Sequence, residues 1–119
     1  MLSKTINIII IINVLIISNT CCDNLELGSE IPLCIENKIE IIKKAAVRNP
    51  PVQVWKWEVD EQTYYYITSE CCDQFNFLYD DNCNIVCAPD GGFTGDGDGN
   101  CPDFRGFIER TLVWEDPRN

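Results

Sequence analysis

The fold is decided by the stretch from Cys71 to Phe104, CCDQFNFLYDDNCNIVCAPDGGFTGDGDGNCPDF. It contains five of the eight cysteines in the chain and five of the seven glycines. Glycine leaves the backbone free to visit many conformations, so the segment from Gly91 to Gly99 is a poor helix or strand former. We therefore predict a long Gly/Asp-rich loop there, ordered by a cross-link through Cys101 or by a ligand.

Six cysteines lie beyond residue 30, namely Cys34, Cys71, Cys72, Cys83, Cys87 and Cys101. In an exported chain an even set of cysteines predicts disulfide bonds, which would stabilise a domain too small for a thick core. The sequence alone does not fix the pairing. Neighbouring residues of an extended strand point to opposite faces. We therefore expect Cys71 and Cys72 to bridge two different places, one to Cys34 and the other to the region 83–101.

The N-terminal segment has the pattern of an export signal. Lys4 precedes the apolar run Ile6–Ile17, which is too short to span a bilayer comfortably and matches the core of a signal peptide. The following Cys21 stands where bacterial lipoproteins carry an acylated cysteine, so we predict lipidation there. Simple secretion and an uncleaved anchor are the alternatives. The predicted organisation is a signal peptide over 1–20, an acidic tether over 21–30, and one small disulfide-rich α+β domain over 31–119.

The domain begins with a predicted amphipathic helix over residues 31–48, because apolar residues recur on one face and cations gather near its C-terminal end. β-Branched and aromatic residues then predict strands over residues 52–60, 63–69, 75–80 and 84–88, with an edge strand over 111–114. The predicted fold class is α+β, with one N-terminal helix packed on a four- to five-strand antiparallel meander.

Aromatic residues concentrate in the first predicted hairpin. Trp55 and Trp57 alternate along one strand and would share a face, while Tyr64, Tyr65 and Tyr66 place rings on both faces of the next strand. Core packing and cross-strand pairing explain these rings, and a binding platform is the other interpretation.

Composition excludes several classes of function. The formal net charge of -10 argues against binding to nucleic acid or to an anionic membrane surface, and it favours solubility or a basic protein partner. The chain has no histidine, which excludes Ser-His-Asp and Cys-His catalysis and histidine-ligated metals. No pair of carboxylates is marked out for glycoside hydrolysis. We therefore expect a protein that is not an enzyme and that contacts a membrane only through an N-terminal lipid.

The loop offers one candidate metal site, because oxygen-bearing side chains alternate with glycine, as in loops that wrap Ca²⁺. The candidate ligands are Asp96, Asp98, Asn100 and Asp103. The EF-hand pattern fails at Cys101 and Phe107, where glycine and glutamate would stand. A solvated turn pinned by a disulfide is the alternative, and no other cofactor is expected.

Four short motifs stand out in the chain, namely Cys71-Cys72-Asp73-Gln74, Asn82-Cys83-Asn84, the run from Cys87 to Gly95 (CAPDGGFTG) and Cys101-Pro102-Asp103-Phe104. Through these motifs the chain resembles a family of small, uncharacterised, lipoprotein-like exported proteins of Bacteroidetes-type bacteria. The resemblance implies an envelope location and an α+β domain, and it implies no activity. From this and the composition we expect a non-catalytic envelope or secreted domain that binds or shields something. An inhibitor of a basic secreted hydrolase and a calcium-stabilised accessory module are the alternatives.

Overall fold

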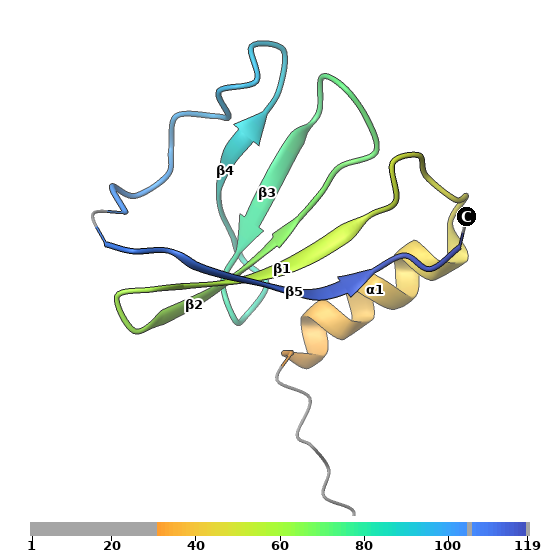
Figure 1. The fold of residues 1–119 in the computed structure, drawn as a ribbon, viewed down its shortest axis with the longest axis horizontal. Coiled ribbons are helices and arrows are strands. Elements are labelled where there is room, and N and C mark those ends of the chain that lie inside the picture. The colour runs from red at the N-terminus through yellow and green to blue at the C-terminus, as the bar shows by residue number, and fades with distance from the viewer. Residues whose placement is uncertain (1–30, 105, 119) are drawn as a thin grey trace, which may run out of the picture.

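A computed structural model describes residues 31–104 and 106–118 (Figure 1). Its elements are α1 (Leu33–Lys44), β1 (Gln53–Val59), β2 (Gln62–Ile67), β3 (Phe75–Tyr79), β4 (Ile85–Gly91) and β5 (Glu109–Glu115). The predicted signal peptide, the lipidation site at Cys21 and the acidic tether lie outside the described residues. Within the described ranges, no helix has both the length and the apolar character needed to cross a membrane.

The sheet is not the meander that we expected. Its five antiparallel strands lie in the order β4-β3-β2-β1-β5, so β5 returns across the sheet and pairs with β1 (Figure 1). The predicted fold class was therefore wrong, because the protein is mostly a five-stranded antiparallel sheet with one short helix in the described part. The error has a physical cause. A strand signal reports half-buried alternation in its own segment and says nothing about which neighbour the strand pairs with.

The helix is also shorter than the predicted span of 31–48. It ends at Lys44 because Ala45 adopts an extended backbone, with φ -81° and ψ 173°. Ile35, Ile39 and Ile42 are the buried residues of α1, and Ile35 and Ile39 pack against Val54 of β1. Full burial of one such side chain contributes roughly 1.5–3 kcal/mol, so this stripe holds the helix against the sheet.

A second apolar cluster lies on the opposite face of the sheet. Trp57, Leu78 and Cys87 are buried there, and Phe104 and Ile108 pack against them from the segment that leads to β5. The connection between β4 and β5 therefore covers a face that the helix leaves open. Burial on both faces explains why the strands carry aromatic residues on both sides.

The turn between β1 and β2 explains the register of the first hairpin. Asp60 and Glu61 both have positive φ, 48° and 65°, and Val59 pairs with Gln62. A two-residue turn of this kind matches the twist of the flanking strands. The predicted hairpin between these segments is present, and Asp60 and Glu61 form its turn.

Three disulfides pair the six described cysteines. Cys34 of the helix bonds to Cys83, and Cys87 bonds to Cys101. Cys71 and Cys72 bond to each other, with a Cα–Cα distance of 3.7 Å, so the expected bridges from this pair to Cys34 and to the region 83–101 were wrong. The argument from alternating strand faces fails because Cys72 has a φ of 53° and is not extended. Several disulfides indicate an oxidising environment outside the cytosol.

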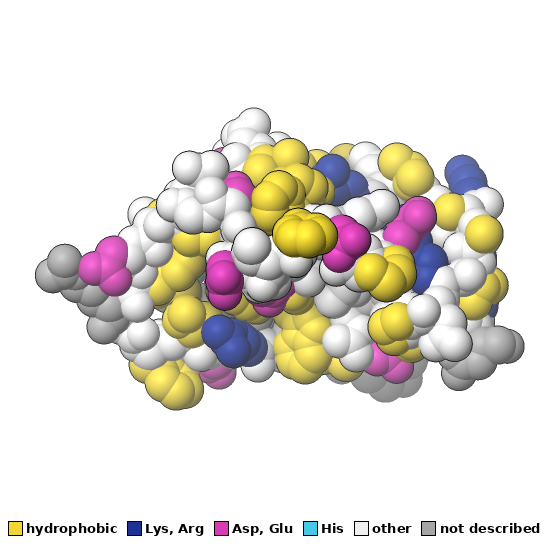
Figure 2. Space-filling view, turned by 90° about the horizontal axis from the view of Figure 1, so that it is seen from above, with side chains coloured by type: hydrophobic (Ala, Val, Ile, Leu, Met, Phe, Trp, Pro, Cys, Tyr) yellow, Lys and Arg dark blue, Asp and Glu magenta, His cyan; other side chains and the backbone are white. Residues whose placement is uncertain are grey.

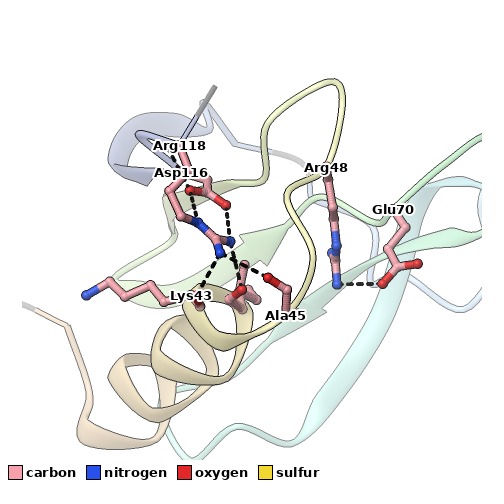
Figure 3. Close-up of polar contacts among 7 residues, drawn as sticks. Lys43, Ala45, Arg48, Glu70, Asp116 and Arg118 are labelled. Carbon is pink, nitrogen blue, oxygen red and sulfur yellow. Dashed lines mark hydrogen bonds and ion pairs between the residues drawn. The ribbon is translucent and has the colours of Figure 1, made fainter.

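The C-terminal end of α1 is capped by an arginine from a distant part of the chain (Figure 3). Nη1 of Arg118 donates to the carbonyl oxygens of Lys43 and Ala45 at 2.7 and 2.9 Å, and Nη2 donates to that of Ile42 at 3.0 Å. The last carbonyls of a helix have no partner inside it, and a cation there also suits the helix dipole. Residues beyond β5 therefore complete the helix.

Candidate functional site

Apolar side chains reach the surface in several places. Figure 2 shows hydrophobic groups in separate patches on one face, with acidic and basic side chains between them. Over the described residues, the most exposed large apolar side chains include Phe93, Phe107 and Leu33, at 91%, 87% and 71%. Scattered exposed apolar side chains are common on protein surfaces, so a candidate site needs apolar and polar groups gathered in one hollow. Two grooves of this mixed character lie on opposite faces of the sheet.

The first groove, which we call the aromatic groove, is lined by Trp55, Trp57, Tyr66, Asp90 and Arg110 and has a volume of about 290 Å³. Strand pairing explains why these residues meet. Trp55 stands opposite Tyr66 of β2, and Trp57 stands opposite Arg110 of β5. Directly opposed residues in an antiparallel sheet share a face. The groove therefore lies on the face opposite the helix, and its lining residues come from β1, β2, β4 and β5.

The inner wall of the aromatic groove is a stack of two rings and a guanidinium. The rings of Trp57 and Tyr66 stack with centroids 5.3 Å apart, and the guanidinium of Arg110 lies 4.4 Å from the centre of the Trp57 ring. Trp57 is only 6% exposed, so these neighbours cover it. A stacked pair with a cation above it holds a fixed orientation, which leaves less conformational freedom to lose on binding.

Trp55 is the more accessible of the two tryptophans in the groove. Its Nε1 donates to Oε1 of Gln53 at 3.0 Å, and Nε2 of Gln53 donates to Oε2 of Glu115 at 2.5 Å. The indole is half-buried, so its edge is fixed by this chain of hydrogen bonds while part of its surface stays open. An amphipathic ring held in this way presents an apolar face to a ligand.

Asp90 provides the acceptor of the groove. Its carboxylate accepts hydrogen bonds from the Tyr66 hydroxyl at 2.8 and 2.9 Å and from Nδ2 of Asn76 at 2.6 Å. Burial, and then hydrogen bonding to Asp90, raise the pKa of Tyr66 above its usual value, so the phenol stays a donor at neutral pH. A carboxylate has more lone pairs than these donors use, so Asp90 can accept another hydrogen bond from a ligand.

The candidate calcium ligands do not form a cluster. Oδ1 of Asp98 accepts a hydrogen bond from the backbone N–H of Asn100 at 2.9 Å, and this bond lowers the pKa of Asp98. The N–H of Asp96 donates to Thr94. No group of three or more His, Cys, Asp or Glu side chains in residues 31–104 and 106–118 is arranged to hold a metal ion. The calcium site at Asp96, Asp98, Asn100 and Asp103 therefore stays a prediction without a supporting arrangement.

Sequence reasoning found the rings of the aromatic groove but missed its polar residues. Alternation placed Trp55 and Trp57 on one face, and both line the groove. Asp90 and Arg110 come from β4 and β5, and their proximity depends on a strand order that the sequence does not state. Asn76 and Asp90 stand opposite each other across β3 and β4, and this pairing beside Tyr66 is visible only in the structure.

Comparison with known proteins gives one result. No curated protein and no solved structure matches the chain. A family model described as a domain of unknown function (DUF6970) matches residues 40–116, a span that covers β1 to β5 and every residue of the aromatic groove. The chain therefore belongs to the DUF6970 family, whose members share a domain of unknown function.

Proposed function

We propose that the protein is an exported, non-catalytic binding domain that holds a saccharide in the aromatic groove. The observation that carries this proposal is the meeting of Trp55, Trp57 and Tyr66 with Asp90 and Arg110 in one groove. In this proposal the domain works in the cell envelope, tethered through a lipid on Cys21, or as a secreted protein.

The chemistry of a sugar ring fits both the apolar and the polar residues of the groove. A pyranose has an apolar face of C–H groups and a rim of hydroxyls. An indole ring packs against the apolar face of the sugar. A carboxylate acceptor and a guanidinium donor form hydrogen bonds with the hydroxyls. Binding sites for small molecules generally combine apolar walls with a few fixed polar groups. The net charge of -10 favours a neutral sugar over a polyanionic one.

Affinity electrophoresis and calorimetry with neutral polysaccharides test this proposal. The probes are glycogen, a soluble mixed-linkage β-glucan and a mannan. We expect one of them to bind, and Trp55→Ala to weaken that binding roughly tenfold through loss of stacking area. Asp90→Asn should weaken it as well, because a carboxylate acceptor becomes an amide. Phe107→Ala is the matched control, since Phe107 is exposed and does not line the groove. The proposal fails if no probe binds, or if Trp55→Ala binds as tightly as the parent protein.

A second candidate function, inhibition of a basic secreted hydrolase, is favoured by the loop after β4. Phe93 is 91% exposed there. The N–H of Gly97 donates to the carbonyl of Gly91 at 3.1 Å, and the Cys87–Cys101 disulfide spans the loop. A protruding aromatic ring on a constrained loop suits insertion into a pocket of a partner. Phe93→Ala should then abolish capture of a basic protein at low salt and leave saccharide binding unchanged. Trp55→Ala should weaken saccharide binding and leave capture of the basic protein unchanged.

A further inference from the structure

A second groove lies on the helix side of the sheet, between α1 and β3, and has a volume of about 320 Å³. We call it the helix–sheet groove. Phe75, Phe77 and Tyr79 of β3 line it, with neighbouring ring centroids 6.1 and 6.4 Å apart. Ile41 of α1 faces the same groove and is 68% exposed. The aromatic ladder therefore gives the groove an apolar floor that the helix does not cover.

The charges of the helix–sheet groove are unequal at its two ends. At one end Nη2 of Arg48 pairs with Oε1 of Glu70 at 2.9 Å (Figure 3). At the other end Nζ of Lys38 lies 4.4 Å from the centre of the Tyr79 ring. Among residues 31–104 and 106–118, no carboxylate forms an ion pair with Lys38. The groove thus offers one unmatched positive charge beside an apolar floor, in a chain whose net charge is negative.

The Arg48 end adds a polar group without a partner. Nε of Arg48 is buried and has no hydrogen-bond partner in the described structure. Its guanidinium is already neutralised by Glu70, so this end has no excess charge to attract a second anion. The excess positive charge therefore belongs to the Lys38 end, and a ligand with a single negative group would place that group there.

We propose that the helix–sheet groove binds a single-chain alkyl carboxylate, with its head group at Lys38 and its chain over Tyr79, Phe77 and Phe75. Charge complementarity favours an anionic ligand, because a carboxylate would pair with the Lys38 ammonium, which has no ion-pair partner among residues 31–104 and 106–118. The apolar floor selects the alkyl chain. Tyr79 lies four residue steps along the strand from Phe75, which corresponds to roughly 13 Å, so the groove suits a medium-length chain. The cation–π contact of Lys38 with Tyr79 holds the ammonium at the Tyr79 end of the groove.

Calorimetric titration of the native, oxidised protein with laurate below its micelle concentration tests this proposal. Dodecyltrimethylammonium and dodecyl maltoside are the matched cationic and uncharged probes. We expect laurate to bind at least tenfold more tightly than either one, and a saturable ratio of one laurate per protein. Across the series hexanoate, octanoate and decanoate, affinity should rise by roughly fourfold for each buried methylene.

Four variants of α1 test the role of the Lys38 charge. Lys38→Gln should weaken laurate binding roughly tenfold, through loss of a charge-assisted hydrogen bond. Lys44→Gln removes a charge that does not line the groove and should leave binding unchanged. Ile41→Glu supplies a carboxylate three residues from Lys38, where it can pair with the ammonium, and should abolish the preference for an anion. Ile41→Gln has nearly the same size and should keep that preference. Both Ile41 variants change an exposed side chain, so the fold is expected to survive.

The results that overturn the proposal are distinct. Equal affinity for laurate and dodecyltrimethylammonium would show that only apolar contact is involved. Unchanged binding by Lys38→Gln would remove the head-group assignment. Binding to anionic phospholipid vesicles without binding to free laurate would indicate a membrane surface as the occupant and would refute the single-chain ligand. The Trp55→Ala variant should bind laurate normally, so failure of the saccharide proposal and failure of this one are independent observations.

Discussion

Arg118 and Asp116 form a pair that lies two residues apart and connects the end of the sheet to the helix. Nη2 of Arg118 lies 2.6 Å from Oδ2 of Asp116, and Nε lies 2.9 Å from Oδ1. Asp116 is 2% exposed, and its backbone N–H donates to the carbonyl of Val52. The carboxylate therefore orients the guanidinium, which in turn satisfies carbonyls at the end of α1 (Figure 3).

Replacing Arg118 with alanine should destabilise the helix end. The variant leaves the last carbonyls of α1 without donors and leaves Asp116 without its cation. We expect the melting temperature to fall by roughly 4–8 °C, as for the loss of one substantial interaction in a domain of this size. Arg118→Lys should not restore it, because an ammonium lacks the planar fork that reaches several acceptors. Lys43→Ala removes an exposed ion pair on the same turn and should change little, so an equal loss there would contradict this prediction.

Acid should weaken the fold through Asp116. Hydrogen bonding from Arg118 lowers the pKa of Asp116 from 3.8 to about 2. A carboxyl whose pKa is lower in the folded state stabilises the fold fully above its unfolded pKa, and this contribution disappears as the pH falls toward the folded value. Thermal melts between pH 5 and 2 should therefore show a loss of stability that begins below about pH 4. Asp116→Asn should flatten the curve in that window. Arg118→Ala should flatten it too, because the pKa is no longer lowered, and a steep curve in both variants would exclude this pair as the cause.

Two glycines of the loop should respond differently to alanine. Gly95 and Gly97 both have positive φ, 83° and 75°, so alanine strains the backbone at either position. At Gly97 a Cβ would also overlap the carbonyl oxygen of Ala88, which accepts a hydrogen bond from the N–H of Asp98. At Gly95 no atom lies within 4 Å of the added Cβ. Urea unfolding should show a loss of roughly 1–2 kcal/mol for Gly95→Ala, and a clearly larger loss for Gly97→Ala. Equal losses would mean that backbone strain alone determines the loss of stability in both variants.

Removing the disulfides one at a time should give a ranking set by loop length. Cys34 and Cys83 are separated by 49 positions in the sequence, and Cys87 and Cys101 by 14. The entropy of the unfolded chain predicts losses of about 4 and about 3 kcal/mol respectively. Adjacent Cys71 and Cys72 close almost no loop, so Cys71→Ser with Cys72→Ser should cost far less. Urea unfolding of the three double variants measures the order, and a large loss for the Cys71–Cys72 pair would contradict it.

The sequence predicts local structure well in this protein and long-range structure poorly. The stripe through Ile35 and Ile39 correctly placed the buried face of the helix, and the alternation of Trp55 and Trp57 correctly placed one face of β1. Periodicity succeeds there because it reports which side of a single element is buried. It did not indicate where the helix ends, because Ala46 continues the apolar spacing while the backbone has already turned at Ala45.

The errors come from relations between distant residues. The partner of β5, the neighbours of Arg110 and the cap from Arg118 all depend on how the chain returns across the sheet. No local propensity encodes that return. The pairing of Cys71 with Cys72 was missed for a different reason. It requires a left-handed backbone at Cys72, a conformation that a non-glycine residue adopts uncommonly.

The position of β5 has a consequence for synthesis on the ribosome. The helix is synthesised early, but its last carbonyls gain their hydrogen-bond donor only when Arg118 has been made. The exposed edge of β1 gains its partner strand only when residues 109–115 have been made. Domains usually fold as complete units while the chain emerges. We therefore expect the nascent chain to stay unfolded until almost all of this domain has left the exit tunnel. An unfolded chain can pass through a translocation channel that accepts only extended polypeptide.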